Sequence, residues 1–161
     1  MKLKNIKIAT ILPYKENYTH SKASAASLWV SEFFKKSRFR NNNYIFGSTL
    51  DNDYLGKNYI NIELKNIKSK FKSTTNEYLK KLIKKIDKKS FDIIEVHNRP
   101  LILEYLLNNI KSRFIFYFHN DPLSMNGSKS EKQRLNIIKN VEKIIFVSKW
   151  VQNRFFIGLD E

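Results

Sequence analysis

Three apolar segments of the chain each run directly into a cluster of polar residues. The clusters are His97-Asn98-Arg99, His119-Asn120-Asp121 and Ser148-Lys149. A histidine can accept or donate a proton near neutral pH, and amide, guanidinium and carboxylate groups can bind hydroxyls or an acidic group. Because His119 follows the most apolar of these segments, we expect it to face a ligand. The other residues of the first two clusters could line the same rim.

Each of these residues also has a structural interpretation. A histidine at the end of a strand can simply bond to the backbone, Asp121-Pro122 can form a turn, and Asn98-Arg99-Pro100 can open and cap a helix. Glu95, two residues before His97 in a predicted strand, should lie on the same face of the sheet as His97. We expect Glu95 to be a buried, paired structural residue, and it is not part of the predicted active set.

The apolar segments have the composition of buried β-strands, and amphipathic helices alternate with them. The predicted strands are Ile6–Leu12, Tyr44–Phe46, Tyr59–Ile62, Asp92–Val96, Phe114–Phe118 and Ile144–Val147. Helices are predicted over Ala25–Lys36 and after Thr74, Pro100, the capping box of Ser130 and Gln133, and Ser148. This alternation predicts an α/β fold with a doubly wound, Rossmann-like parallel sheet, as one domain spanning residues 1–161. Such sheets bind ligands at the carboxyl ends of their strands, where the polar clusters lie.

The spacing of apolar residues predicts which side of a helix packs on the sheet. The residues expected to point inward are Ala25, Leu28, Trp29 and Phe33 in the first helix, and Leu135, Ile138 and Val141 in the helix after Ser130. Phe114–Phe118 is apolar on both faces, which is typical of a strand in the middle of a parallel sheet.

Residue types that the sequence lacks exclude several kinds of chemistry. The absence of cysteine excludes disulfides, zinc-thiolate sites, iron-sulfur clusters and cysteine nucleophiles. With four glycines, at positions 47, 56, 127 and 158, the chain contains neither the dinucleotide motif G-x-G-x-x-G nor a phosphate-binding P-loop. It also lacks the G-x-S-x-G motif of serine hydrolases. His97, His119 and Asp121 do not have the spacing of a metal site, so we predict neither a metal nor a cofactor.

The formal net charge of +15 could attract nucleic acid, anionic lipid or acidic glycans. Lysine, asparagine and isoleucine are all abundant, however, and Lys80-Lys81 and Lys84-Lys85 recur at helical spacing, as on a solvated helix face. Binding and compositional bias therefore both stay open as explanations of the charge. No apolar stretch approaches the roughly 18 residues of a membrane-spanning helix, and we expect a soluble, cytoplasmic protein.

Several segments of the chain carry a likeness to a known family. They are Asp92–Pro100, Phe116–Pro122, Asn126–Lys129, and Ile145–Ser148 with Arg154-Phe155 after it. Together they resemble the N-terminal domain of a family 4 glycosyltransferase with the GT-B fold. The chain as a whole is similar to bacterial lipopolysaccharide glycosyltransferases, and the resemblance runs through most of its length.

The resemblance implies the acceptor-binding half of an enzyme that needs a second domain. In this family the N-terminal domain mainly holds the acceptor, and the C-terminal domain binds the sugar nucleotide through a Glu-x7-Glu motif. That motif is missing from the 161 residues, so we expect either a fragment or one half of a split enzyme. The family transfers sugars with retention at the anomeric carbon and generally without a metal.

Matching the family position by position assigns roles to the polar clusters. His119 is then the catalytic residue near the reacting sugar, and the substrate-binding residues are His97, Asn98, Arg99, Asn120 and Asp121. The family usually has a glycine-containing loop after the first strand, but Lys22–Ala26 stands there in this chain. This departure argues against a close approach of the backbone to donor phosphate.

We therefore predict the acceptor-binding half of a retaining, metal-independent glycosyltransferase that modifies a cell-surface glycan or lipid-linked acceptor and is inactive alone. Its partners would be that acceptor and a nucleotide-sugar donor, shared with a missing C-terminal domain or a separate chain. The alternative is a non-catalytic module that binds glycan or anionic lipid. A nucleic-acid-binding domain is a further rival, but no base-stacking motif supports it, and we predict no nucleic acid partner. Peripheral contact with the inner face of the plasma membrane stays open.

Overall fold

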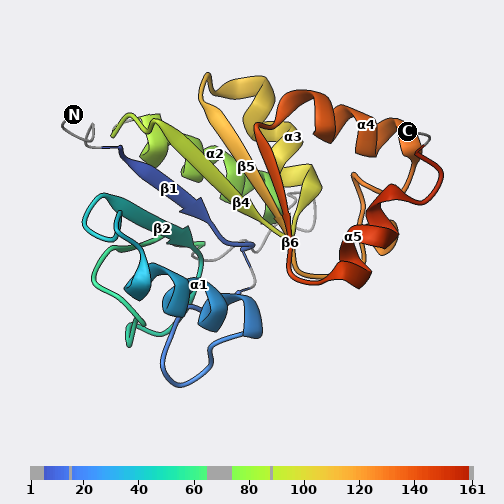
Figure 1. The fold of residues 1–161 in the computed structure, drawn as a ribbon. Helices are drawn as coiled ribbons and strands as arrows, with labels where there is room; N and C mark the ends of the chain where they lie inside the picture. The colour runs from blue at the N-terminus through green and yellow to red at the C-terminus, as the bar shows by residue number, and fades with distance from the viewer. Residues whose placement is uncertain (1–5, 15, 65–73, 88, 160–161) are drawn as a thin grey trace, which may run out of the picture.

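The structure, a computed structural model, describes residues 6–14, 16–64, 74–87 and 89–159. Its strands are β1 (Ile8–Ile11), β2 (Asn43–Gly47), β3 (Tyr59–Asn61), β4 (Ile93–His97), β5 (Arg113–Phe118) and β6 (Lys143–Phe146). They form one sheet in the order β3-β2-β1-β4-β5-β6, in which every neighbouring pair is parallel (Figure 1). The predicted parallel sheet is confirmed.

Helices cover both faces of the sheet and connect its strands, except that a loop joins β2 to β3. They are α1 (Ala25–Lys36), α2 (Thr74–Asp87), α3 (Pro100–Asn109), α4 (Glu131–Asn140), α5 (Lys149–Phe156) and the short 3-10 helix η1 (Pro122–Ser124). Helix α1 lies on one side of the sheet, and α2 and α3 lie on the other (Figure 1). The fold is therefore the doubly wound, Rossmann-like α/β fold that the sequence predicts.

The strand order sets the place of the ligand rim. The chain builds β1, β2 and β3 toward one edge and then crosses back to place β4 on the other side of β1. At such a switch point the loops diverge and leave a crevice at the carboxyl ends of the strands. His97 is the last residue of β4, and His119 follows the last residue of the neighbouring β5. Both histidines therefore lie beside the switch point.

Each face of the sheet has its own core. The larger core contains Ile11, Val96 and Phe116, against which apolar residues of α2 and α3 pack. The smaller core lies beneath α1 and consists of Leu12, Tyr18, Val30, Ile45 and Tyr59. Successive residues of a strand alternate between faces, so the polar residues of the central strands gather on the α1 side. Strand β5 pairs with β4 and β6 on its two sides, as expected of an interior strand.

The predicted packing face of α1 is wrong in part. Its buried residues are Ala26, Ser27, Val30 and Ser31. Leu28 and Phe33 are each 49% exposed and Ala25 is exposed as well, whereas Trp29 is partly buried against the smaller core, as predicted. Helix α1 therefore buries small side chains such as Ser27 and Ser31 and leaves Leu28 and Phe33 exposed.

The predicted inward face of α4 is wrong for Leu135 and Ile138, but Val141 is partly buried against the larger core, as predicted. Leu135 is 54% exposed and Ile138 is exposed as well, whereas Arg134 is 2% exposed and Ile137 is buried. The Arg134 guanidinium donates hydrogen bonds to the backbone carbonyls of Ser128, Lys129 and Ile157. These bonds tie α4 to the loop before it and to the chain after α5, and they turn the helix away from its apolar periodicity.

The N-terminal ends of the helices agree with the sequence predictions more closely than their buried faces do. Ser130 and Gln133 form the predicted capping box of α4, and the hydroxyl of Ser148 caps α5. Pro100 occupies the first turn of α3, as predicted. Among the described residues, no helix combines the length and the apolar character that crossing a bilayer requires.

Candidate functional site

A row of hydrogen-bonded polar side chains crosses the sheet beneath α1. Thr10 of β1 lies in register with Glu95 of β4, and its Oγ1 is 2.7 Å from Glu95 Oε2 and 3.0 Å from Asn43 Oδ1. On the other side, the hydroxyl of Tyr117 donates to Glu95 Oε1 at 3.3 Å. The row thus connects β2, β1, β4 and β5 through buried side chains.

Glu95 occupies the centre of this row. Burial raises the pKa of its carboxyl, and the hydrogen bonds with Thr10 and Tyr117 only partly offset this. The Thr10 hydroxyl has one proton and can donate to only one of its two neighbours. When Glu95 is protonated, it donates to Thr10 and Thr10 donates to Asn43, so every contact is satisfied. Glu95 is therefore buried and paired, as expected, and its partners are the neutral hydroxyls of Thr10 and Tyr117.

His97 and His119 meet at the end of this row. Nδ1 of His97 lies 2.9 Å from Nε2 of His119. The His97 ring stacks on Tyr117 with ring centroids 4.3 Å apart, and Trp29 of α1 packs against both imidazoles. Trp29, which is predicted to point inward, packs against the smaller core and also covers the histidine pair.

Burial sets the charge of the histidine pair. It lowers the pKa of His97 well below the ordinary value, and the neighbouring His119 lowers it further. Burial also lowers the pKa of His119, although the nearby Glu16 carboxylate opposes this. Both imidazoles are therefore neutral near pH 7. His119 is the more accessible of the two.

Asn98 and Asp121 have internal partners. Asn98 is buried with a positive φ of 55°, and its Oδ1 accepts from the backbone N–H of His119 at 3.4 Å. Asp121 forms an ion pair with Arg154 of α5 at 2.9 Å and accepts from the N–H of Leu123 at 3.0 Å. The side chain of Arg154 lowers the pKa of Asp121. Both residues hold the backbone of the rim, and their substrate-binding role stays a prediction.

Arg99 and Asn120 are exposed and line a cavity at the rim of about 550 Å³. Ligand cavities in proteins are commonly about 300–1,000 Å³. The other lining residues are Tyr14, Thr75, Pro100, Leu101, Ile102, Ser124, Met125, Asn126 and Lys129. Sequence reasoning did not assign a site role to Tyr14, Asn126 or Lys129, although Asn126–Lys129 belongs to the segments that carry the family resemblance.

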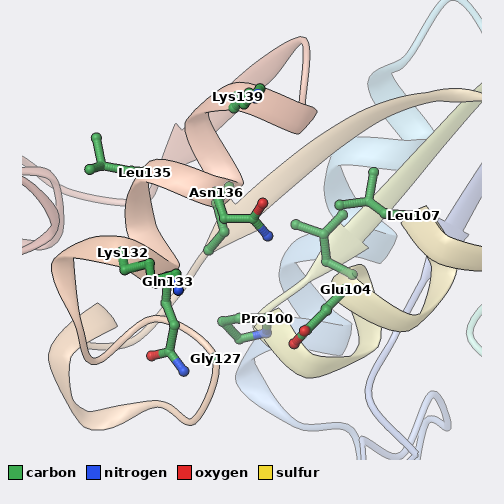
Figure 2. A pocket seen from close by; sticks show the side chains of 11 residues that line it. Pro100, Glu104, Leu107, Gly127, Lys132, Gln133, Leu135, Asn136 and Lys139 are labelled. Carbon is green, nitrogen blue, oxygen red and sulfur yellow. The ribbon is translucent and has the colours of Figure 1, made fainter.

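A second cavity, of about 500 Å³, lies between α3 and α4 (Figure 2). Glu104 and Leu107 of α3 lie on one side of it, and Gln133 and Asn136 of α4 lie on the other. None of the predicted site residues lines this cavity. Gly127 also lines this cavity, and a Cβ there would lie 3.0 Å from Pro100 Cβ and 3.1 Å from Leu101 N. His97 and His119 line neither cavity. Arg99 and Asn120 line the rim cavity, which is therefore the candidate site.

The geometry limits what the site could hold. Within the described parts of the chain, no three His, Cys, Asp or Glu side chains are placed so that they could bind a metal together. The two histidines already use one nitrogen each on one another. The rim instead offers hydrogen-bond donors and acceptors and a guanidinium, which suit a hydroxylated or anionic ligand.

Of the comparisons with known proteins, the one with solved structures found a protein of similar fold. No family model matches the chain, and no curated protein matches it in sequence. Among solved structures, it is similar to sucrose-phosphate synthase from Thermosynechococcus elongatus, with a TM-score of 0.65 and 10% sequence identity. The match covers 96% of this chain and 45% of that protein, so the chain spans less than half of its length. The chain thus has a Rossmann-like fold that resembles one domain of a GT-B enzyme.

Proposed function

We propose that the chain is the acceptor-binding half of a retaining, metal-independent glycosyltransferase, similar to the family 4 enzymes of bacterial lipopolysaccharide synthesis. The observation that carries the proposal is the GT-B-like fold over 96% of the chain. The polar rim at its switch point supports it, because the fold binds ligands there. The donor-binding half is not among these residues.

The rim cavity is the proposed acceptor site. Arg99, Asn120 and Lys129 line it, and they supply donors for hydroxyls or for an acidic group on the acceptor. The side chains of Arg99 and Lys129 form no ion pair or hydrogen bond with another described residue that would occupy them. An acceptor held here would direct one hydroxyl toward the anomeric carbon of the donor sugar.

The donor sugar would lie on the accessible side of His119. The chain has no glycine-rich phosphate loop, so a second domain would hold the nucleotide diphosphate. Closure of the two domains would exclude water and favour transfer to the acceptor over hydrolysis. His119 is the proposed catalytic contact to the reacting sugar, and the chain alone should not turn over.

A sugar-transfer assay with labelled nucleotide sugars and bacterial envelope glycolipids tests this proposal. We expect no transfer by the 161-residue chain alone and transfer when a nucleotide-sugar-binding domain from its own genome is co-expressed with it. In the active pair, His119→Ala should lower kcat by at least about 100-fold, the usual size of a lost catalytic contact.

His20→Ala is the matched control, because His20 is exposed and lies outside the rim cavity. This variant should keep full activity. Turnover by the chain alone, or equal activity of the His119→Ala and His20→Ala pairs, would contradict the proposal.

A second candidate is a non-catalytic module that binds glycan or anionic lipid at the same rim. The internal partners of Asn98 and Asp121 favour it, because they leave binding groups rather than reactive groups at the cavity. Tight glycan binding that is unchanged by His119→Ala and needs no second chain would support this candidate over the enzyme.

A further inference from the structure

His97 and His119 share a hydrogen bond for which one ring nitrogen must supply the proton. The two atoms, His97 Nδ1 and His119 Nε2, lie 2.9 Å apart. Both imidazoles are neutral near pH 7, so each ring carries a single proton on one of its nitrogens. The bond can therefore have two forms, with the shared proton on His97 or on His119.

The second nitrogen of His97 distinguishes the two forms. His97 is 1% exposed, and its Nε2 is buried with no hydrogen-bond partner among the described residues. If His119 donated, the proton of His97 would lie on this Nε2 as a buried N–H without an acceptor. If His97 donates, only a lone pair is left there. Proteins leave buried acceptors unpaired more often than buried N–H groups, which favours donation by His97.

We propose that His97 is a positioning residue, which donates from Nδ1 to His119 Nε2 and thereby holds the proton of His119 on Nδ1. That Nδ1 is not among the buried unpartnered atoms and bonds to no other described residue. Because His119 is only partly buried, its Nδ1–H can bond to water or to a ligand, and the Glu16 carboxylate lies near the same ring. His119 presents a hydrogen-bond donor, and not a lone pair, to whatever binds at the rim.

Rings on both sides keep the pair in this orientation. His97 stacks on Tyr117 at 4.3 Å, and the hydroxyl of Tyr117 is held by Glu95 at 3.3 Å. Trp29 and His119 pack in a T-shaped arrangement, with ring centroids 5.4 Å apart. Rotation of either imidazole would break these contacts, so the positioning extends back to the polar row beneath α1.

The tautomer limits the chemistry of His119. Its only lone pair already accepts from His97, so His119 does not act as a general base in this state. A fixed N–H suits an oxygen acceptor, such as a sugar hydroxyl or a phosphate oxygen. Only the identity of this ligand rests on the proposed function, because the tautomer belongs to the chain itself.

Long-range ¹H–¹⁵N correlation spectra of the ¹⁵N-labelled chain at pH 7.5 measure the tautomer directly. The chain has three histidines, and the exposed His20 serves as the internal reference. We expect the protonated nitrogen to be Nδ1 in both His97 and His119. Protonation of His119 on Nε2 would overturn the proposal. No substrate is present, so failure of glycosyl transfer would leave this result intact.

Two variants separate positioning from a structural role. The amide of His97→Asn can still donate from near the position of Nδ1, and this variant should keep His119 in the Nδ1–H form. His97→Leu has no donor, so His119 should shift toward the Nε2–H form and its pKa should rise. An unchanged tautomer in His97→Leu would overturn the proposal, and if that variant does not fold, the wild-type spectrum decides. His20→Gln should change neither His97 nor His119.

Discussion

At the scale of single residues, a buried carboxyl lies in the middle of the sheet. Glu95 bonds to the hydroxyls of Thr10 and Tyr117, and burial raises its pKa from the ordinary value of 4.5. The neutral carboxyl therefore stabilises the fold fully below about pH 4.5. This stabilisation is lost as the pH rises through the higher pKa of the folded state.

Glu95→Gln should remove this pH dependence, because an amide keeps the hydrogen bonds and carries no charge. The free energy of unfolding of the wild type should fall relative to that of the variant as the pH rises above 4.5, by up to about 1.4 kcal/mol per pH unit. Urea unfolding of both proteins between pH 4 and pH 8 measures the difference. A difference in stability that is the same at every pH would mean that the pKa of Glu95 is not raised in the fold, which would contradict this prediction.

The place of the rim could be predicted from the sequence, but most of its contacts could not. His97 and His119 follow apolar strands, and parallel strands bring their carboxyl ends to one edge. The direct bond between them depends on the register of β4 and β5, which periodicity does not reveal. The ion pair of Asp121 with Arg154 joins residues far apart in the chain, and no local pattern indicates it.

At the scale of elements, strand and helix positions followed from local sequence, whereas helix orientation did not. Apolar periodicity predicts which residues could be buried, and it assumes that the largest apolar side chains of a helix face the sheet. In α1 the small residues Ser27 and Ser31 pack closely instead. In α4 the hydrogen bonds of one arginine outweigh the burial of Leu135 and Ile138. Both outcomes depend on tertiary contacts that are absent from the sequence pattern.

Arg134→Met should therefore destabilise the protein. Methionine fills a similar space but leaves the carbonyls of Ser128, Lys129 and Ile157 without their donor, at a cost of about 2–4 kcal/mol in the free energy of unfolding. The midpoint of urea unfolding measures this cost. Since Lys129 also lines the rim cavity, the amide signals of that loop should shift as well.

Lys132→Met is the matched control on the same helix, because Lys132 is exposed. It should change the free energy of unfolding by less than about 0.5 kcal/mol. Equal effects of the two substitutions would mean that the Arg134 hydrogen bonds do not hold α4 in place.

At the scale of the whole molecule, the alternation of strands and helices was enough to predict the fold class. The likeness to sucrose-phosphate synthase at 10% identity supports the same fold without indicating a substrate. The net charge of +15 does not choose a partner either, since it is compatible with acidic glycans, anionic lipids and a solvated surface. Under the proposed function, the acceptor binds these residues and the donor needs a second domain.

Chemical-shift mapping of the ¹⁵N-labelled chain tests most directly whether these residues bind the acceptor and not the donor. The ligands are a panel of neutral and phosphorylated core oligosaccharides of bacterial lipopolysaccharide and, separately, UDP-glucose and GDP-mannose. We expect an oligosaccharide to shift the amide signals of Arg99, Asn120 and Lys129 and to leave those of Glu104 and Asn136 in the other cavity unchanged. Neither nucleotide sugar alone should perturb the rim. Rim shifts caused by a nucleotide sugar, with none caused by any oligosaccharide, would contradict the proposed acceptor site.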